Sequence, residues 1–376
     1  PELGEENVMS TTFDDFASAY IKGAKPESIM EFVERHYEED KSEERGASKE
    51  NKMTYRERLD CFLNEYYDSL KFRKKMGLKT KFLSSAELDE LKRDVPSKLR
   101  INARFDYLAE RICAKFDIDQ VKNAPKMKEK IMDILGVIKD PLKLYEEFSH
   151  KIISGIVPYE DIFAIIYIYF EVWGYPSFSN IKVVVIDEAQ DYSMWQFEFL
   201  KRIFNQAVFT ILGDKNQRVN PYIKYDSMEK IAEVFRDSKY KKLFNTYRSS
   251  KEIIEYSNKI LGLEGINSIR PSNGQKVSEK ESDNLAHDIE VELERFRGLG
   301  FKRLAVVTKT KVEAEKLKKS IDNEADFIPV YLAKGLEYDG VIVASEKSKG
   351  FTADESNLFY VASTRALHIL TVFNKN

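Results

Sequence analysis

Several features of common protein classes are scarce in this sequence. Only two of its 376 residues are cysteines, Cys61 and Cys113, and its four histidines are scattered without metal-ligand spacing. This pattern argues against a disulfide framework and against a cysteine or histidine metal site, and it fits a reducing compartment. The formal net charge is only -3. The chain therefore lacks an overall basic field, and any nucleic-acid groove must be local.

Long hydrophobic runs are also missing. The longest apolar stretch, residues 162–170, ends at Glu171, far short of the roughly 20 residues that a membrane-spanning helix needs. The first residues are acidic and polar, without an initiator methionine or the basic and apolar regions of a signal peptide. We therefore expect a cytoplasmic protein that has no membrane partner and that is cut from a longer chain.

The composition is that of a globular protein with two or three domains, because 43% of the residues are hydrophobic and 33% are charged. Residues 29–150 are rich in charge, and their apolar residues recur at helical spacing, which predicts a mostly helical insertion. A basic run from Lys71 to Lys81 lies within it. This run is either a phosphate-contacting surface or, as we favour, a solvated helix end and loop.

Short β-branched runs predict two α/β domains with parallel sheets. The first pair of strands, 181–186 and 208–212, is separated by a helical stretch, which is typical of buried parallel strands. A second set is expected at 241–244, 303–308, 327–330, 341–344 and 368–373, and the polar segment 267–284 reads as an exposed loop. We assign residues 1–28 and 151–236 to the first domain, 29–150 to the insertion and 237–376 to the second domain.

Acidic and amide side chains follow the first two predicted strands. Asp187 and Glu188 come directly after the apolar residues 183–186, at a strand end where α/β sheets bind ligands. Adjacent carboxylates suit a nucleotide site, since one can hold Mg²⁺ while the other orients the attacking water. Asp214 and Gln217 follow the next strand, where an amide could sense a terminal phosphate. The alternatives are an acidic turn and an ordinary Gly-Asp turn.

Three later segments carry further candidate side chains. Tyr247 and Arg248 combine an aromatic face with a guanidinium, which could stack on a base and hold a phosphate. Gly335 and Glu337 lie in a turn before a strand, and Arg365 is expected on the polar face of a helix. Each segment alone is compatible with an ordinary surface.

Taken together, the segments DEAQD, LGDKNQ, NTYRSS, AKGLEYD and YVASTRA resemble the second to sixth motifs of the UvrD and Rep type of superfamily 1 helicases, in family order. The resemblance implies two RecA-like domains that close on ATP and Mg²⁺. Asp187 would contact Mg²⁺, Glu188 would be the catalytic base, Gln217 would sense the γ-phosphate, and Asp214 would lie beside the nucleotide.

The same resemblance implies roles for the second half of the chain. Tyr247 would stack on adenine, while Gly335 and Glu337 would lie near the phosphates and the ribose. Arg248 and Arg365 would be arginine fingers that stabilise charge on the transferred phosphoryl group. Near the start, Thr12 and Phe13 belong to a Thr-Thr-Phe sequence that resembles the family's motif for gripping single-stranded nucleic acid.

Two features depart from the family pattern. No G-x-x-x-x-G-K-[ST] sequence occurs, so the lysine and amides that cradle the phosphates are missing. We expect a fragment that begins downstream of this loop and that hydrolyses ATP slowly or not at all. The short stretch between Ser250 and Arg303 leaves no room for the accessory domain of UvrD and Rep. With PYED and PVYLAKG, this resembles the HelD group, which includes DNA helicase IV and RNA-polymerase-associated factors.

Three functions remain as hypotheses. A motor that moves on single-stranded DNA needs aromatic stacking platforms and a basic channel. A factor that uses the same ATP cycle to free RNA polymerase needs protein-binding arms, and the slightly acidic charge and missing accessory domain favour it. A nucleotide-binding interaction module without catalysis would not need both carboxylates and both arginines. The sequence leaves polarity, DNA against RNA, and the oligomeric state open.

Overall fold

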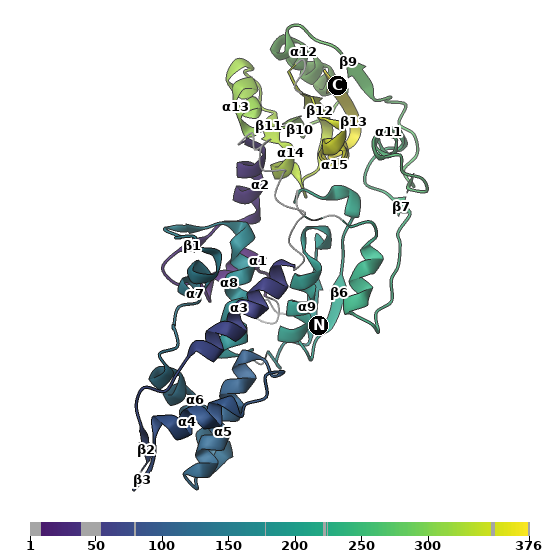
Figure 1. Cartoon of the computed structure of the whole chain (residues 1–376). Coiled ribbons are helices and arrows are strands. Elements are labelled where there is room, and N and C mark those ends of the chain that lie inside the picture. The colour runs from purple at the N-terminus through teal and green to yellow at the C-terminus, as the bar shows by residue number, and fades with distance from the viewer. Residues whose placement is uncertain are drawn as a thin grey trace. The chain divides into compact units, whose positions relative to one another are not determined.

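The computed structural model describes residues 9–38, 54–78, 80–176, 178–220, 223, 225–346 and 350–374 (Figure 1). The chain divides into two compact units, Pro1–Ser28 with Gly46–Ser177, and Ile29–Arg45 with Phe178–Asn376. Parallel sheets flanked by helices confirm the predicted α/β class. The domain boundaries predicted from the sequence stay predictions. In the part that the structure describes, no helix is long and apolar enough to cross a membrane.

The first unit is mostly helical. Its helices are α1 (Phe13–Ser18), α3 (Tyr55–Ser69), α4 (Ser85–Arg93), α5 (Ile101–Lys115), α6 (Gln120–Leu135), α7 (Pro141–Ser149) and α8 (Tyr159–Trp173). Two short strands, β1 (Lys25–Pro26) and β4 (Ile156–Val157), pair in parallel. The segments before and after the predicted helical insertion therefore lie side by side. The strands β2 (Met76–Leu78) and β3 (Lys81–Leu83) form an antiparallel hairpin.

The long apolar run of the sequence forms the core helix of this unit. Helix α8 is hydrophobic on nearly all sides, and such a helix is stable only when it is enclosed by other elements. Asp161 in its first turn is buried, where it accepts a hydrogen bond from the Tyr145 hydroxyl and pairs with Lys151 at 3.4 Å. In the basic run between Lys71 and Lys81, Lys81 pairs with Asp117 and Lys75 lies over the Phe82 ring.

The second unit contains a five-stranded parallel sheet in the order β11-β10-β12-β13-β9. Its strands are β9 (Ser278–Lys280), β10 (Leu304–Thr308), β11 (Asp326–Pro329), β12 (Tyr338–Ala344) and β13 (Ala366–Phe373). Strand β10 is buried along its whole length and β12 at every residue except Asp339. Helices α12 (Leu285–Gly298) and α13 (Lys311–Ser320) pack on the sheet around Phe296 and Leu317. The remaining helices are α2 (Ile29–Glu38), α9 (Met194–Ile203), α10 (Ile231–Val234), α11 (Lys251–Leu261), α14 (Val330–Ala333) and α15 (Ser356–Ser363).

A two-stranded parallel ladder, β5 (Val183–Ile186) with β6 (Val208–Ile211), carries the first group of candidate residues. Among the described residues no third strand pairs with it. Its apolar side chains are unusually open: Val183, Val185 and Val208 are 60%, 61% and 69% exposed. The β-branched runs therefore form strands as predicted, but half of their side chains lie outside the core.

Two strand predictions were wrong in detail. Residues 241–244 form no strand, and the next strand, β7, contains only Asn245–Thr246, paired with β8 (Asn267–Ser268). Leu243 follows two lysines and is 88% exposed, and Phe244 is 53% exposed, so the two apolar side chains of this run are not packed in a core. The polar segment 267–284, predicted as a loop, provides the edge strand β9, because backbone pairing with β13 does not need apolar side chains.

A buried carboxylate makes the second unit sensitive to acid. Glu292 on α12 accepts hydrogen bonds from Arg295, Lys280 and Thr371. Burial alone would raise the pKa of Glu292, but these three bonds outweigh it and lower the pKa to about 2. Because the folded pKa lies below the unfolded one, the stabilisation is complete above about pH 4.5 and is lost as the pH falls towards 2.

We therefore expect Glu292→Gln to lower the melting temperature at neutral pH and to weaken its decline between about pH 4.5 and pH 2. Glu294→Gln is a matched control, because Glu294 lies on the same helix in an exposed pair with Arg297 and such pairs contribute little. Thermal melting followed by circular dichroism over this pH range tests the expectation. Equal acid sensitivity in both variants would contradict it.

Candidate active site

The acidic loop after β5 has a constrained backbone. Asp187 is exposed, and one of its carboxylate oxygens accepts the Glu188 N–H at 2.8 Å. Glu188 has a φ of 51°, in the left-handed region that costs energy for a residue other than glycine. A short 3₁₀ turn, η3 (Ala189–Asp191), follows, and the Ala189 N–H bonds to Leu212 O at 2.9 Å. The loops after β5 and β6 are thus held together at one edge of the ladder.

Gln190 connects these two loops and was missed by sequence reasoning. Its side chain is 1% exposed. Its amide nitrogen donates to Glu188 Oε2 at 2.5 Å and to Gln217 O at 3.3 Å, while its oxygen accepts the Asp214 N–H at 3.0 Å. A Cβ on Gly213 would lie only 2.8 Å from that oxygen, which explains the glycine. The Gln190 amide thereby sets the position of the Glu188 carboxylate.

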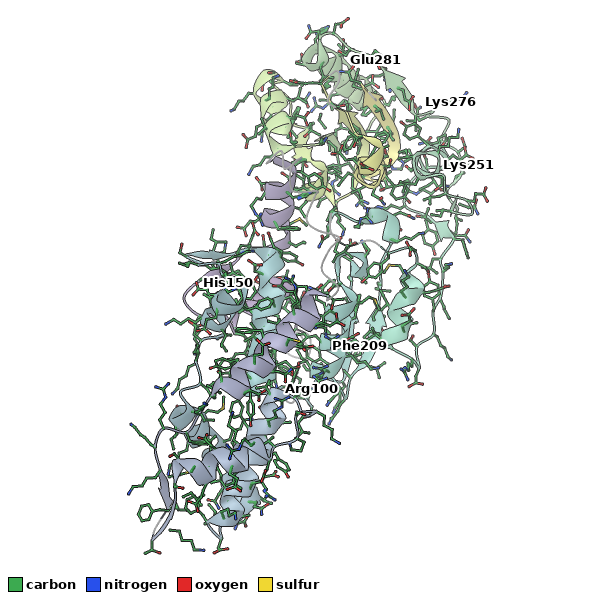
Figure 2. All side chains as sticks on the ribbon, in the orientation of Figure 1. Arg100, His150, Phe209, Lys251, Lys276 and Glu281 are labelled. Atoms are coloured by element: carbon green, nitrogen blue, oxygen red, sulfur yellow. The ribbon has the colours of Figure 1, made fainter. Side chains whose placement is uncertain are left out.

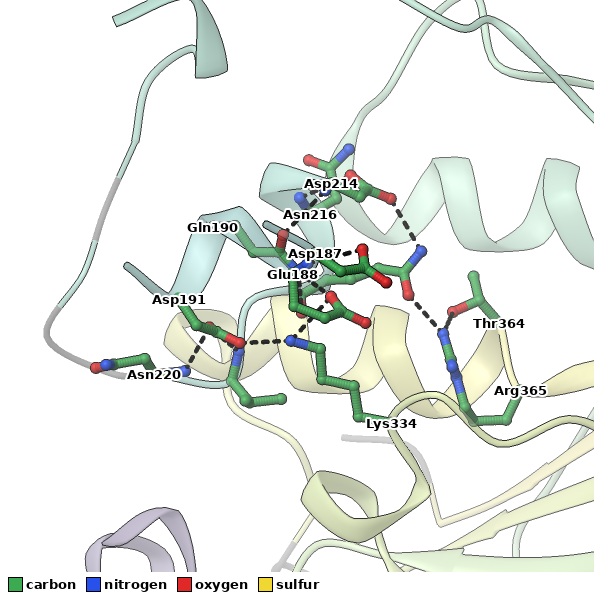
Figure 3. A network of polar contacts seen from close by, with 12 residues as sticks. Asp187, Glu188, Gln190, Asp191, Asp214, Asn216, Asn220, Lys334, Thr364 and Arg365 are labelled. Atoms are coloured by element: carbon green, nitrogen blue, oxygen red, sulfur yellow. Dashed lines mark hydrogen bonds and ion pairs between the residues drawn. The ribbon is translucent and has the colours of Figure 1, made fainter. Parts of the chain in front are cut away.

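Lys334 is the second residue that sequence reasoning left without a role. It follows α14, its side chain is 5% exposed, and its ammonium lies 3.1 Å from Glu188 Oε2 and bonds to Asp191 (Figure 3). The other Asp191 oxygen accepts the N–H groups of Val219 and Asn220 at 3.2 and 3.1 Å. A buried ammonium needs compensating charge, and here two carboxylates supply it.

Arg365 closes the opposite end of the same network. Its guanidinium donates to Gln217 Oε1 at 2.6 Å, to Val361 O at 2.9 Å and to Leu336 O at 3.4 Å. Gln217 in turn donates to Asp214 Oδ2 at 3.0 Å. Burial, followed by the charge of Arg248, lowers the pKa of Arg365 to about 10. The group is therefore still protonated at neutral pH.

The expectation that Arg365 lies on the polar face of a helix was wrong. Helix α15 ends at Ser363, and Arg365 follows it with a side chain that is 0% exposed. Its carbonyl accepts the Tyr338 N–H at 3.0 Å, next to the start of β12 and β13. An arginine can be enclosed here because side-chain and backbone oxygens accept its hydrogen bonds.

Arg248 meets the same turn as Arg365. Its guanidinium donates to Leu336 O at 2.9 Å and lies 2.9 Å from Glu337 Oε1. Gly335 has a φ of 80°, a conformation that favours glycine, and this bends the turn so that one carbonyl meets both arginines. Tyr247 beside Arg248 is 73% exposed, so one aromatic face is open.

The structure thus connects seven of the predicted residues through direct contacts or adjacency in one loop: Asp187, Glu188, Asp214, Gln217, Arg248, Glu337 and Arg365. Thr12 and Phe13 lie in the other unit. Thr12 caps helix α1 through its hydroxyl, and Phe13 is 7% exposed and packs on Phe163. Their contact with nucleic acid stays a prediction.

The fit of a magnesium ion depends on shared ligands. Within the described ranges, no group of three or more histidine, cysteine or acidic side chains could hold a metal by itself. The exposed carboxylate of Asp187 suits the usual mode for Mg²⁺, in which one or two protein oxygens are completed by water and by substrate phosphates. The residues therefore fit an ion that arrives with a nucleotide.

Comparison with known families identifies this arrangement. The UvrD/REP helicase N-terminal domain matches residues 4–222, more than half of the chain, and the UvrD-like helicase C-terminal domain matches residues 324–373. The chain belongs to the UvrD/Rep helicase family. The two matched ranges include the acidic loop, Asp214, Gln217, Lys334, Glu337 and Arg365, so the network lies within the helicase domains. Helicases of this type use ATP with Mg²⁺.

Solved helicase structures are also similar over parts of the chain. The C-terminal domain of a possible DNA helicase from Lactobacillus plantarum is 25% identical, with 35% of this chain and 88% of that one covered and a TM-score of 0.29. The PRRSV helicase is 18% identical, with 51% and 35% covered and a TM-score of 0.33. The chain spans about a third of the length of that viral helicase. No curated protein matches the chain.

Proposed function

We propose that this protein is the ATP-hydrolysing part of a superfamily 1 motor that couples the ATP cycle to movement on nucleic acid or to the release of RNA polymerase. One observation carries the proposal. A continuous chain of hydrogen bonds joins Glu188, Gln190, Asp214, Gln217 and Arg365. Phosphoryl transfer needs a catalytic base, a residue that senses the terminal phosphate and an arginine, and this chain of hydrogen bonds links a candidate for each.

Each part has a chemical task in this proposal. Glu188 accepts the proton of the attacking water, and the Gln190 amide holds one of its oxygens so that the other can face the water. Asp187 would hold Mg²⁺, and the ion would supply positive charge that neutralises the phosphates. Gln217 and Asp214 respond to the terminal phosphate and pass that response to Arg365.

The arginines stabilise the charge that develops on the transferred group. Arg248 and Arg365 share the Leu336 carbonyl, so a movement of this turn shifts both. Tyr247 would offer its exposed ring to adenine. Gly335 and Glu337, in the turn that pairs with Arg248, would lie beside the phosphates and the ribose.

Lys334 acts as a positioning residue for the base. In this structure its ammonium forms ion pairs with both Glu188 Oε2 and Asp191. The ammonium thereby covers a carboxylate oxygen that would otherwise be open to water. Release of Lys334 from Glu188 when a nucleotide binds would therefore activate the base, and Asp191 would retain the lysine nearby.

Features of the sequence support the finer assignment to a HelD-like factor in the cytoplasm. The short connection between Ser250 and Arg303 and the net charge of -3 favour a polymerase-remodelling protein over a processive DNA motor. The sequence contains no G-x-x-x-x-G-K-[ST] motif, so in this proposal the phosphate-binding loop is supplied by a separate segment. A nucleotide-binding module without catalysis is the weaker alternative, because it would not need Arg365 and Glu188 in one network.

We expect the chain by itself to turn over ATP slowly or not at all, since no lysine of a phosphate-binding loop is present. A version extended by the phosphate-binding loop of a related helicase should hydrolyse ATP. Its turnover is to be measured with no addition, with single-stranded DNA and with RNA polymerase. Stimulation by DNA alone would identify a translocating motor, and stimulation by polymerase alone a remodelling factor. Rapid turnover by the unextended chain would contradict the role of the missing loop.

A further inference from the structure

A cavity of about 370 Å³ lies in the first unit, and none of the residues that line it belongs to the candidate active site. It is formed where the end of α8 meets α5, α6 and the residue Tyr20 after α1. Four aromatic side chains and two polar ones line it, together with Gly174 and Pro176: Tyr20, Tyr169, Trp173, Tyr175, Asn102 and Lys128. Nothing in the proposed ATP cycle uses these residues.

The aromatic wall breaks the burial pattern of its helix. From Asp161 to Trp173, every residue of α8 is buried except Tyr169 and Trp173, which are half-buried and one turn apart. Their rings are nearly parallel, at 27° and 5.4 Å between centroids, and the Tyr20 ring lies 5.0 Å from Tyr169. An otherwise enclosed helix therefore exposes two large stacked rings to one cavity, although core packing would favour covering them.

The two polar side chains that line the cavity, Asn102 and Lys128, are held in place by hydrogen bonds. Lys128 pairs with Asp106 at 2.8 Å and donates to Asn102 Oδ1, while Asn102 Nδ2 donates to Asp106 Oδ2 at 3.1 Å. The chain can pass close to Asn102 because Gly174 has no Cβ, which would lie 2.8 Å from Asn102 Oδ1. An amide and an ammonium held in this way present hydrogen-bonding groups at the edge of the aromatic wall.

The charges around the cavity are balanced. Lys128 is paired with Asp106, and Arg100 at the start of α5 is paired with Glu171 at 2.9 Å. A free phosphate would find no unpaired cation among these residues. A neutral planar ring with polar edges fits better, because the rings can stack on its faces and Asn102 can bond its edge. The Arg100 side chain, labelled in Figure 2, is 49% exposed and bonds to Glu171 through one terminal nitrogen. A guanidinium has five N–H groups, so Arg100 could also bond a phosphate attached to that ring.

We propose that this cavity binds a base of single-stranded nucleic acid, stacked against Trp173 and Tyr169. The choice of ligand rests on the proposed function as a nucleic-acid motor, and the site would give the first unit its own hold on the strand. Stacking on aromatic rings tolerates any base, since every base has a flat face. The site should therefore bind strands of different sequence with similar affinity.

Tryptophan fluorescence tests the proposal directly. The chain has two tryptophans, so Trp195→Phe makes Trp173 the sole reporter. This variant of the full chain is titrated with oligothymidylate and oligoadenylate of about 12 nucleotides, within the span of typical single-strand sites. Both strands should quench Trp173 to saturation. Labelled-strand anisotropy should show affinity about tenfold weaker in Trp173→Ala and nearly unchanged in Trp173→Phe, which keeps a ring.

The alternative outcomes separate this site from the proposed function. Strand binding by anisotropy without quenching, and with equal affinity in Trp173→Ala, would overturn the cavity as a base site but leave the motor intact. Quenching by thymidine or adenosine monophosphate as strongly as by the strands would also overturn it, in favour of a small-molecule site. No strand binding by the unsubstituted chain would overturn it as well, and ATP turnover by the extended version would then decide the proposed function separately.

Discussion

ATP turnover is expected to fall by about a hundredfold or more when Glu188 is replaced by glutamine, because loss of a general base typically costs this much. The glutamine amide has nearly the same shape, so it can still occupy the place between Gln190 and Lys334. Nucleotide binding should change little, since the substitution removes a proton acceptor and not a phosphate contact. The measurement is steady-state turnover in the form of the protein that hydrolyses ATP, with binding of a fluorescent ATP analogue alongside.

Lys334 provides an internal check on this result. If its ammonium restrains the base, Lys334→Met should alter the rate of turnover more than nucleotide affinity, and Lys334→Arg should restore part of the difference. Glu294→Gln is the matched control for Glu188→Gln, because Glu294 is exposed and pairs with Arg297 on the same helix. Turnover in Glu188→Gln equal to that of this control would remove Glu188 from the mechanism.

Of the substitutions proposed, Arg365→Ala should lower the free energy of unfolding most, because Arg365 is the largest of the fully buried side chains. Its removal leaves Gln217 Oε1 and the carbonyls of Val361 and Leu336 without this donor and opens a void. Breaking a buried charged network of this kind costs about 3 kcal/mol. The melting temperature should then fall by roughly 6–12 °C for a unit of this size.

Turnover should decline in Arg365→Ala as well, by about a thousandfold if the guanidinium acts on the phosphoryl group. Arg365→Lys keeps the charge but not the planar set of donors, so it should recover more stability than activity. Arg297→Ala is the control, because Arg297 forms a half-exposed pair with Glu294. Differential scanning calorimetry and turnover together separate the roles, and a melting temperature equal to that of the control would contradict the network's contribution.

The grouping of the active site could be predicted because it follows from chain order and sheet geometry. Asp187 and Asp214 each follow a strand of one parallel ladder, so their loops must meet at the same edge. The apolar run 162–170 was used only to exclude a membrane span, but its composition is also that of an enclosed helix, which is what α8 is.

The contacts that complete the site could not be predicted in the same way. Lys334 and Asp191 are 143 positions apart, and no local pattern indicates that this lysine is buried between two carboxylates. Arg365 was expected at a polar surface because arginine is rarely enclosed, and its burial depends on carbonyls supplied by distant turns. The length of β9 and the absence of a strand at 241–244 likewise depend on which edge was available for pairing.

The open ladder of β5 and β6 also bears on how the protein behaves in solution. Valine side chains that stand 60–69% exposed on a narrow parallel ladder form a surface that water wets poorly. The outer edges of such a ladder carry backbone groups that can pair with another extended chain. Concentrated samples should therefore associate reversibly and more strongly in sulfate-rich buffers, which strengthen apolar contacts, so low protein concentrations suit measurements on the active-site loop next to it.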